Sequence, residues 1–275
     1  MVNKTPMSKN DSTAIRLRES RRPARRPAQR KVKRFPESRF IATDRRPAAR
    51  RRRLAAANRE QPACAGQWHI APAGNRSRGY LIVKRIIDVA GAIAILTLVS
   101  PLLLAVSAVL TVTTKGHPFF CQERLGYLGR PFRLYKFRTM VLDAENLRSL
   151  VRNEMEGPVF KNRADPRITR IGRILRQTSI DELPQLLNVI RGDMSLIGPR
   201  PPLAQEVMQY RPLQRKRLAV RPGLTCLWQV SGRNDICFAR WMQMDLWYVK
   251  HQNLLTDFVL LLQTPWAVIS GRGAH

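Results

Sequence analysis

The sequence predicts a mixed α/β fold that is mainly helical and is attached to a membrane. Two observations support this prediction. Residues 89–114 form an apolar segment of 26 residues without a single charge. After it, short stretches with the two-residue period of strands alternate with stretches that have helical spacing. Of the 275 residues, 44% are hydrophobic, which is sufficient for a folded core and excludes a chain that is disordered throughout.

The first 80 residues are strongly basic. They contain 22 Lys and Arg against 5 Asp and Glu, in a chain whose formal net charge is +30. Arginine runs such as residues 50–53 have no apolar period, so we expect residues 1–80 to be a disordered tail. Its charge suits an anionic membrane surface or nucleic acid, and it is equally compatible with a solvated extension.

The apolar segment is long enough to cross a bilayer, because a span takes about 20 residues. Ser100 and Pro101 lie at its middle, and proline removes a backbone hydrogen bond, so we expect a kink there. Lys84 precedes the segment and Lys115 follows it, and positive charge on both flanks favours the cytoplasmic side for both. We therefore expect residues 81–116 to form a re-entrant hairpin that is broken at the Ser-Pro pair. We favour this path over a single crossing of the bilayer or a buried soluble helix.

A cytosolic domain with interfacial helices is expected over residues 117–275. Residues 133–138 alternate and predict a strand, residues 143–155 have helical spacing, and residues 168–190 predict two amphipathic stretches around a turn. Residues 237–270 are rich in Trp, Tyr and Met and continue into apolar runs too short to span. They predict helices that lie in the membrane interface or, alternatively, ordinary core packing.

Adjacent carboxylates at Asp181 and Glu182 are the most informative feature of this domain. Ser179 and Glu182 have the spacing of a helix capping box, which needs no chemistry. The nearby basic residues are Lys136, Arg138, Lys161, Arg167, Arg170, Arg173, Arg176 and Arg200. A carboxylate pair among guanidinium groups suits a polyanionic substrate with a bridging divalent metal, because arginine matches phosphate oxygens and hard cations prefer oxygen ligands.

The four histidines and four cysteines are scattered and predict neither a zinc site nor a disulfide framework.

A series of short motifs extends from Lys84 towards the C-terminus. The motifs are Lys84-Arg-Ile-Ile-Asp88, Ser100-Pro101, Gln122-Glu-Arg-Leu-Gly126, Tyr135-Lys-Phe-Arg-Thr-Met140, Asp165-Pro-Arg-Ile-Thr169, Ser179-Ile-Asp-Glu-Leu-Pro-Gln185, Gly192-Asp-Met-Ser-Leu-Ile-Gly-Pro-Arg-Pro201, Pro222-Gly-Leu-Thr225 and Gln229-Val-Ser-Gly-Arg-Asn234. In these motifs and their order the chain resembles the bacterial sugar transferases, the monotopic polyprenyl-phosphate phosphoglycosyl transferases. It is similar in particular to those that start exopolysaccharide synthesis.

The resemblance implies an enzyme of the bacterial cytoplasmic membrane whose catalytic domain faces the cytoplasm. Its activity would be the transfer of hexose 1-phosphate, with galactose or glucose as the sugar, from a UDP-sugar to undecaprenyl phosphate. Mg²⁺ would be the cofactor and UMP the released product. The other implied partners are membrane lipid and the downstream glycosyltransferases that would extend the primed carrier.

The resemblance also assigns roles to individual residues. Asp181 would be the nucleophile that forms an acyl phosphate, and Glu182 would hold Mg²⁺. The cations expected to bind and stabilise phosphate charge are Lys136, Arg138, Arg176 and Arg200. Ser100 and Pro101 would form the break in the membrane hairpin.

The alternative is a basic membrane-associated scaffold or a nucleic-acid-binding protein without catalysis. Nucleic-acid binding predicts aromatic side chains interleaved with Lys and Arg, whereas residues 1–80 contain only Phe35, Phe40, Trp68 and Tyr80. It also leaves the apolar segment unexplained, so we expect no nucleic-acid partner. A scaffold would not need adjacent carboxylates among arginines.

Overall fold

The computed structural model describes residues 70–72, 76–114, 116–233 and 236–270. They belong to one folded unit that spans Pro62–His275. Most of the basic tail expected over residues 1–80 therefore lies outside the described residues. Its last residues belong to the folded unit, because helix α2 begins at Arg78.

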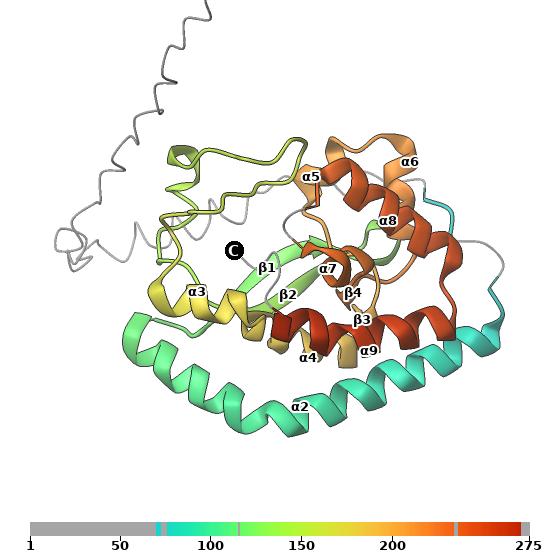
Figure 1. Ribbon diagram of the computed structural model, residues 1–275, viewed down its shortest axis with the longest axis horizontal. Coiled ribbons are helices and arrows are strands. Elements are labelled where there is room, and N and C mark those ends of the chain that lie inside the picture. The colour runs from blue at the N-terminus through green and yellow to red at the C-terminus, as the bar shows by residue number, and fades with distance from the viewer. Residues whose placement is uncertain (1–69, 73–75, 115, 234–235, 271–275) are drawn as a thin grey trace, which may run out of the picture. The chain divides into compact units, whose positions relative to one another are not determined.

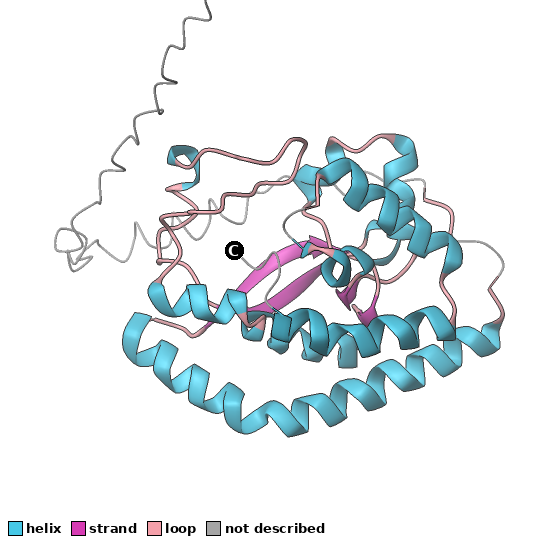
Figure 2. Ribbon diagram, in the orientation of Figure 1, coloured by secondary structure: helices cyan, strands magenta, loops and turns pink. Residues whose placement is uncertain are grey.

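Helices predominate among the described residues, and short strands lie between them (Figure 2), as expected for a mixed, mainly helical fold. With η marking a 3₁₀ helix, the elements are α2 (Arg78–Thr114), β1 (Phe119–Leu125), η2 (Tyr127–Gly129), β2 (Pro131–Phe137), η3 (Arg148–Leu150), α3 (Arg170–Gln177), η4 (Ile180–Gln185), α4 (Leu186–Arg191), β3 (Ser195–Ile197), α5 (Ala204–Met208), α6 (Pro212–Arg215), η5 (Lys216–Ala219), β4 (Gly223–Thr225), α7 (Leu227–Ser231), α8 (Phe238–His251) and α9 (Leu254–Ser270). Strands β1 and β2 form an antiparallel hairpin, and β3 and β4 form a separate parallel pair.

Helix α2 continues through Pro101 as one helix of 37 residues. Figure 1 shows it bowed, with both arms rising towards the rest of the folded unit. Its most apolar window of 18 residues has a mean hydropathy of 2.5 and is only 6% buried, so the interpretation as a buried soluble helix is wrong. By length and composition the helix can cross a membrane. The chain stays helical through the Ser-Pro pair and makes no turn there, and the re-entrant path remains a prediction.

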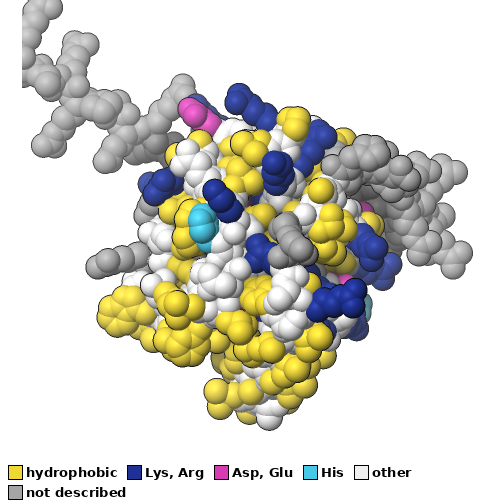
Figure 3. Space-filling model, turned by 90° about the vertical axis from the view of Figure 1, so that its right-hand side faces the viewer, with side chains coloured by type: hydrophobic (Ala, Val, Ile, Leu, Met, Phe, Trp, Pro, Cys, Tyr) yellow, Lys and Arg dark blue, Asp and Glu magenta, His cyan; other side chains and the backbone are white. Residues whose placement is uncertain are grey.

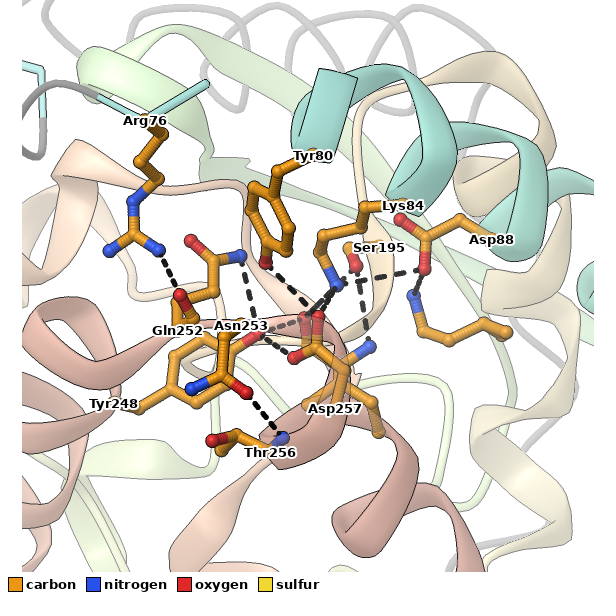
Figure 4. A network of polar contacts seen from close by, with 12 residues as sticks. Arg76, Tyr80, Lys84, Asp88, Ser195, Tyr248, Gln252, Asn253, Thr256 and Asp257 are labelled. Atoms are coloured by element: carbon orange, nitrogen blue, oxygen red, sulfur yellow. Dashed lines mark hydrogen bonds and ion pairs between the residues drawn. The ribbon is translucent and has the colours of Figure 1, made fainter. Parts of the chain in front are cut away.

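Polar contacts fasten the first arm of α2 to α9 and β3 (Figure 4). Nζ of Lys84 lies 2.9 Å from Oδ2 of Asp257, which also accepts a hydrogen bond from Tyr80 Oη at 3.1 Å. Oδ1 of Asp88 accepts a hydrogen bond of 3.0 Å from the backbone N–H of Leu196. These charge-assisted contacts hold the first arm of α2 against α9 and β3.

Apolar contacts fasten the second arm of α2. Leu110 is fully buried and packs with Phe137 of β2 and Leu175 of α3. Burial of one such leucine contributes about 1.5–3 kcal/mol. Both arms of α2 therefore contact the same folded unit, on either side of Pro101.

Three predictions about the middle of the chain have different outcomes. The strand expected over residues 133–138 is confirmed as β2, and the two stretches of residues 168–190 are confirmed as α3 and then η4 with α4. The helix expected over residues 143–155 is wrong, because among these residues only turns and the short η3 form. The backbone carbonyl of Ala144 accepts a hydrogen bond from Nη1 of buried Arg167 at 3.0 Å, which withdraws it from a helical ladder.

The C-terminal region separates into two helices of different character. In α8 Trp241 and Tyr248 are 5% and 2% exposed, whereas Trp247 is 46% exposed, so one face of this helix follows the core-packing alternative. In α9 Leu260 packs into the core, while several other apolar residues face outwards: Phe258 is 57% exposed and Trp266 is 74% exposed. Figure 3 shows apolar side chains gathered at the lower end of the molecule, where α2 lies in Figure 1. Of the two C-terminal helices, α9 has the surface that an interfacial helix requires.

Candidate active site

The carboxylate pair lies on η4, directly after α3. Asp181 is 7% exposed and Glu182 is half-buried. Ser179 precedes them in the left-handed conformation, with φ of 58°, and its side chain does not cap the helix. Its Oγ instead accepts a hydrogen bond of 3.2 Å from Nη2 of Arg233. The capping-box interpretation is therefore wrong, and the two carboxylates are free for another role.

Asp181 is surrounded by cations from three different elements. Lys136 comes from β2, Arg176 from α3 and Arg200 from the loop after β3. Burial is the strongest influence on the pKa of Asp181 and raises it, and the charge of Glu182 raises it further. The three cations lower it, and the outcome is a pKa of about 7. Asp181 thus changes its charge near neutral pH, which is unusual for an aspartate.

Lys136 is the titratable partner of Asp181. Burial lowers the pKa of Lys136 to about 8, and the charges of Arg124 and Arg176 lower it too, while Asp181 raises it. Its Nζ lies 5.2 Å from the ring centroid of Phe120. Between these two pKa values a carboxylate and an ammonium group coexist in the site.

A cleft opens beside this pair. Its lining consists of Arg124, Leu134, Lys136, Glu182, Gln185, Arg200, Pro201, Gly223, Leu224 and Gln229. Three of the predicted site residues, Lys136, Glu182 and Arg200, thus share one cavity. Asp181 and Arg176 do not belong to this lining, and the Nε of Arg176 donates to Thr139 Oγ1 at 2.9 Å. Charged groups converge on the cavity, as is typical of a binding site for a charged ligand.

Arg138 lies outside this lining. Strand β2 ends at Phe137, and the Nε of Arg138 donates to the carbonyl of His117 at 3.0 Å. The structure therefore does not bring Arg138 to the cleft with the other predicted phosphate-binding cations.

Arg124 of β1 is a cleft residue that sequence reasoning missed. It is 7% exposed, and its Nε donates to Gln122 Oε1 at 3.2 Å. Burial and the neighbouring charge of Arg200 lower the pKa of Arg124 to about 10. The motif from Gln122 to Gly126 contained the signal, but it did not indicate which side chain of the strand faces the site. Gln185 and Gln229 are uncharged and gave no signal beyond their place in the motifs.

Two glycines allow the loops of the cleft to meet. Gly198 and Gly223 belong to the ends of the parallel pair β3 and β4, and the N–H of Gly223 donates to the carbonyl of Pro199 at 3.0 Å. A Cβ added to Gly223 would lie 2.0 Å from the backbone nitrogen of Gly198. The close approach of the two backbones places the loop of Arg200 against strand β4, and it leaves no room for a side chain.

Replacement of Gly223 by Ala is expected to destabilise the domain, because the added methyl group would force the two backbones apart. Overpacking of this kind costs about 1–3 kcal/mol. The apparent Tm in detergent should fall by several degrees. Gly79→Ala is the control, since a Cβ there meets nothing within 4 Å. An unchanged Tm for Gly223→Ala would contradict the close approach.

The donor set of the cleft fits a magnesium ion that is shared with a phosphorylated substrate. The described residues contain no group of three or more His, Cys, Asp or Glu that could enclose a metal ion. Mg²⁺ is commonly held by one or two carboxylates together with substrate phosphates and water. Glu182, a carboxylate in the lining of the cleft, supplies such a ligand.

The fold and the cleft define a class of protein: a domain on an exposed apolar helix, with a buried aspartate, a second carboxylate and converging cations. Comparison with known families matches residues 79–271 to "Bacterial sugar transferase". The chain therefore belongs to the bacterial sugar transferase family, which confirms the resemblance found in its motifs.

Several curated relatives are similar over this region. The galactosyl transferase CpsE of Streptococcus agalactiae is 45% identical over 199 residues, which cover 71% of this chain and 44% of the relative. The undecaprenyl-phosphate galactose phosphotransferase of Salmonella typhimurium is 40% identical over 205 residues, covering 72% and 43%. The exopolysaccharide production protein ExoY of Sinorhizobium fredii is 40% identical over 200 residues, covering 70% and 88%. The matched region thus spans less than half of the first two relatives and most of the third.

Proposed function

We propose that this protein is a phosphoglycosyl transferase that moves hexose 1-phosphate from a UDP-sugar to undecaprenyl phosphate and releases UMP. The observation that carries this proposal is the buried Asp181, with a pKa of about 7, among Lys136, Arg176 and Arg200. The names of two relatives include galactose, and that of a third includes exopolysaccharide production. We therefore place galactose first and glucose second as the sugar, in the priming step of a surface glycan.

The reaction takes place in two displacements at the same phosphorus atom. A carboxylate oxygen of Asp181 attacks the phosphorus that bears the sugar, and the bond to the bridging oxygen of the diphosphate breaks, so that UMP leaves. An oxygen of undecaprenyl phosphate then attacks the acyl phosphate, and the aspartate carboxylate is regenerated. Splitting one difficult transfer into two easier steps is the advantage of covalent catalysis.

The cations of the site compensate the charge that accumulates on the phosphate oxygens. Arg200 and Arg124 line the cleft with guanidinium groups, and Lys136 adds an ammonium group next to Asp181. Arg124 is held in place before the substrate arrives, by hydrogen bonds to Gln122 Oε1 and to the carbonyl of Pro201, so it stabilises the transition state without reorganisation. A magnesium ion held by Glu182 would neutralise further phosphate charge.

The anchor brings this site to the lipid substrate. Both arms of α2 contact the folded unit, through Lys84 and Leu110, and α9 presents Phe258 and Trp266 to the outside. We propose that α2 enters the cytoplasmic leaflet, bends at Pro101 and returns, and that α9 lies in the interface. The cytoplasmic face of the inner membrane then offers the UDP-sugar from one side and the polyprenyl phosphate from the other.

A re-entrant α2 predicts that both of its ends are cytoplasmic. Single cysteines at Val83→Cys and His117→Cys, in a chain whose native cysteines are replaced by serine, should react with a membrane-impermeant maleimide only after the cells are opened. The replacement is needed because Cys121 and Cys237 are exposed. Labelling of one of the two positions in intact cells whose outer membrane is permeabilised would show that the helix crosses the bilayer.

The proposed function is tested by UMP release. Purified protein in nanodiscs, with undecaprenyl phosphate and Mg²⁺, is offered UDP-galactose, UDP-glucose and UDP-N-acetylgalactosamine in parallel. We expect UMP and a lipid-linked diphosphate sugar from at least one donor, with the highest kcat/KM for UDP-galactose. A membrane-associated scaffold would release no UMP from any of them, and release of UDP instead of UMP would indicate a different reaction. The lipid product is the substrate that a downstream glycosyltransferase would extend.

A further inference from the structure

The loop that carries Arg200 is held by its backbone carbonyl groups. The carbonyl of Pro199 accepts a hydrogen bond from the N–H of Gly223, and each of the next three carbonyl groups of the loop also has a donor. Nη2 of Arg217 donates to the carbonyl of Arg200 at 2.8 Å, and Nη1 of Arg124 donates to that of Pro201 at 3.2 Å. The N–H of Leu125 donates to the carbonyl of Pro202 at 2.9 Å. Four successive carbonyl groups of the loop, those of residues 199–202, thus accept hydrogen bonds from other parts of the protein.

Arg217 is the unusual member of this set, because it is a charged residue that is only 1% exposed. It lies on η5, and its Nη2 forms an ion pair of 2.6 Å with Asp245 of α8, which is also 1% exposed. Its Nη1 donates to Tyr210 Oη at 2.8 Å, and its guanidinium group lies 5.5 Å from the ring centroid of Trp241. Arg217 does not belong to the lining of the cleft, so it reaches a substrate only through the residues it holds.

Stability alone does not account for this ion pair. Removing two charges from water has a desolvation cost of several kcal/mol per ion, and apolar residues of similar volume are often as stable in such a place. What an apolar pair cannot provide is a donor for the carbonyl of Arg200. Asp245 cancels the charge of Arg217, which would otherwise add to the positive charge of Arg124 and Arg200 close by.

We propose that Arg217 and Asp245 are positioning residues that fix the main chain at Arg200, so that its side chain stays aimed into the cleft for the diphosphate. This inference rests on the proposed function, since that function gives Arg200 its phosphate. A displacement of about 1 Å in a positioned group can reduce a rate by about 10²-fold. The inference therefore predicts a loss of activity from residues that never touch the substrate.

A double-mutant cycle with Arg200 tests it. The apolar pair Arg217→Met/Asp245→Leu removes both charges and leaves neither buried alone, and we expect it to fold with a Tm within a few degrees of wild type. Its kcat/KM for the UDP-sugar should fall at least tenfold, mainly through KM. On an Arg200→Gln background the same pair should lower kcat/KM by less than about threefold, because the effects of mutations that act through one group do not add. Equal losses on both backgrounds, or no loss at all, would overturn the inference.

A second buried ion pair serves as the matched control. Arg167 and Asp165 lie 2.6 Å apart, with side chains 7% and 4% exposed, and Arg167 also donates to a carbonyl, that of Ala144. The pair Arg167→Met/Asp165→Leu should show the same loss, whatever its size, with and without Arg200→Gln. Should the apolar pair at 217 and 245 fail to fold, Arg217→Lys replaces it, because it keeps the charge pair but presents a single ammonium group in place of the guanidinium fork.

A binding readout separates this inference from the proposed function. The affinity for UMP is measured by calorimetry on wild type, on Arg200→Gln, on the apolar pair at 217 and 245, and on the combination of the two. It should show the same non-additive pattern without any turnover. If UMP binding shows this pattern across the four proteins but wild type releases no UMP from any UDP-sugar, the proposed function fails and the positioning role stands. If UMP release is normal and the pattern is additive, the positioning role fails alone. Wild type that neither binds nor releases UMP overturns both.

Discussion

Asp181→Asn is expected to reduce UMP release by at least about 10³-fold, because an amide cannot form the acyl phosphate. The fold should persist, since Asn is nearly isosteric with the protonated Asp and a neutral group is no harder to bury. Incubation of wild type with UDP-sugar labelled in the sugar, without lipid acceptor, should leave label on the protein. The Asn variant should retain none. Both are measured after rapid separation from free nucleotide.

Asp143→Asn is the matched control, because Asp143 is an exposed aspartate of the same domain. It should release UMP and retain label like wild type. Glu182→Gln should be impaired in a different way: a neutral amide is a poorer ligand for a hard cation, so its activity should recover in part at high Mg²⁺. An Asp181→Asn variant that turns over at the normal rate would overturn the proposed mechanism.

Lys136→Met is expected to reduce kcat/KM at pH 7 by about 10²–10³-fold, for two reasons that act together. It removes a cation that stabilises phosphate charge in the transition state. It also removes a charge that lowers the pKa of Asp181, so that this pKa rises above about 7 and a larger fraction of the nucleophile is protonated. Lys250→Met, at an exposed lysine of α8, is the control and should be nearly silent.

The pH profile distinguishes these two reasons. In wild type, kcat/KM should fall below pH 7 as Asp181 takes up a proton and fall above pH 8 as Lys136 loses one, giving a bell. In Lys136→Met the acid limb should move to higher pH and the alkaline limb of Lys136 should disappear. Lys136→Arg keeps its charge throughout, so it should lose the alkaline limb alone. Wild-type activity that is flat from pH 6 to 9 would contradict the assignment of both groups.

The carboxylate pair of the candidate site was predictable from the sequence. Asp181 and Glu182 are adjacent in the chain, so no fold is needed to bring them together, and an aspartate-glutamate pair among arginines has few structural uses. The choice between capping and chemistry was not predictable. It depended on Ser179, whose left-handed backbone and contact with Arg233, 54 positions away in the sequence, exclude the capping box.

Lys136 and Arg138 show where sequence reasoning fails. Two residues apart in a strand, they should share one face, and both were assigned to phosphate. The strand ends at Phe137, and the side chain of Arg138 turns to the carbonyl of His117. Arg124 takes a place in the cleft instead, and only the antiparallel pairing of β1 with β2 brings it there.

What the sequence by itself determined is local: the uncharged segment that becomes α2, the alternation that becomes β2 and the carboxylate pair on η4. These depend on spacing within one stretch of chain, which composition and period express directly. The tertiary structure decided which aromatic residues of the two C-terminal helices are covered: Trp241 and Tyr248 of α8 are buried, whereas Phe258 and Trp266 of α9 are exposed. It also decided the pKa of Asp181 and placed Arg217 behind Arg200, because burial and charge depend on neighbours that are distant in the sequence and close in space.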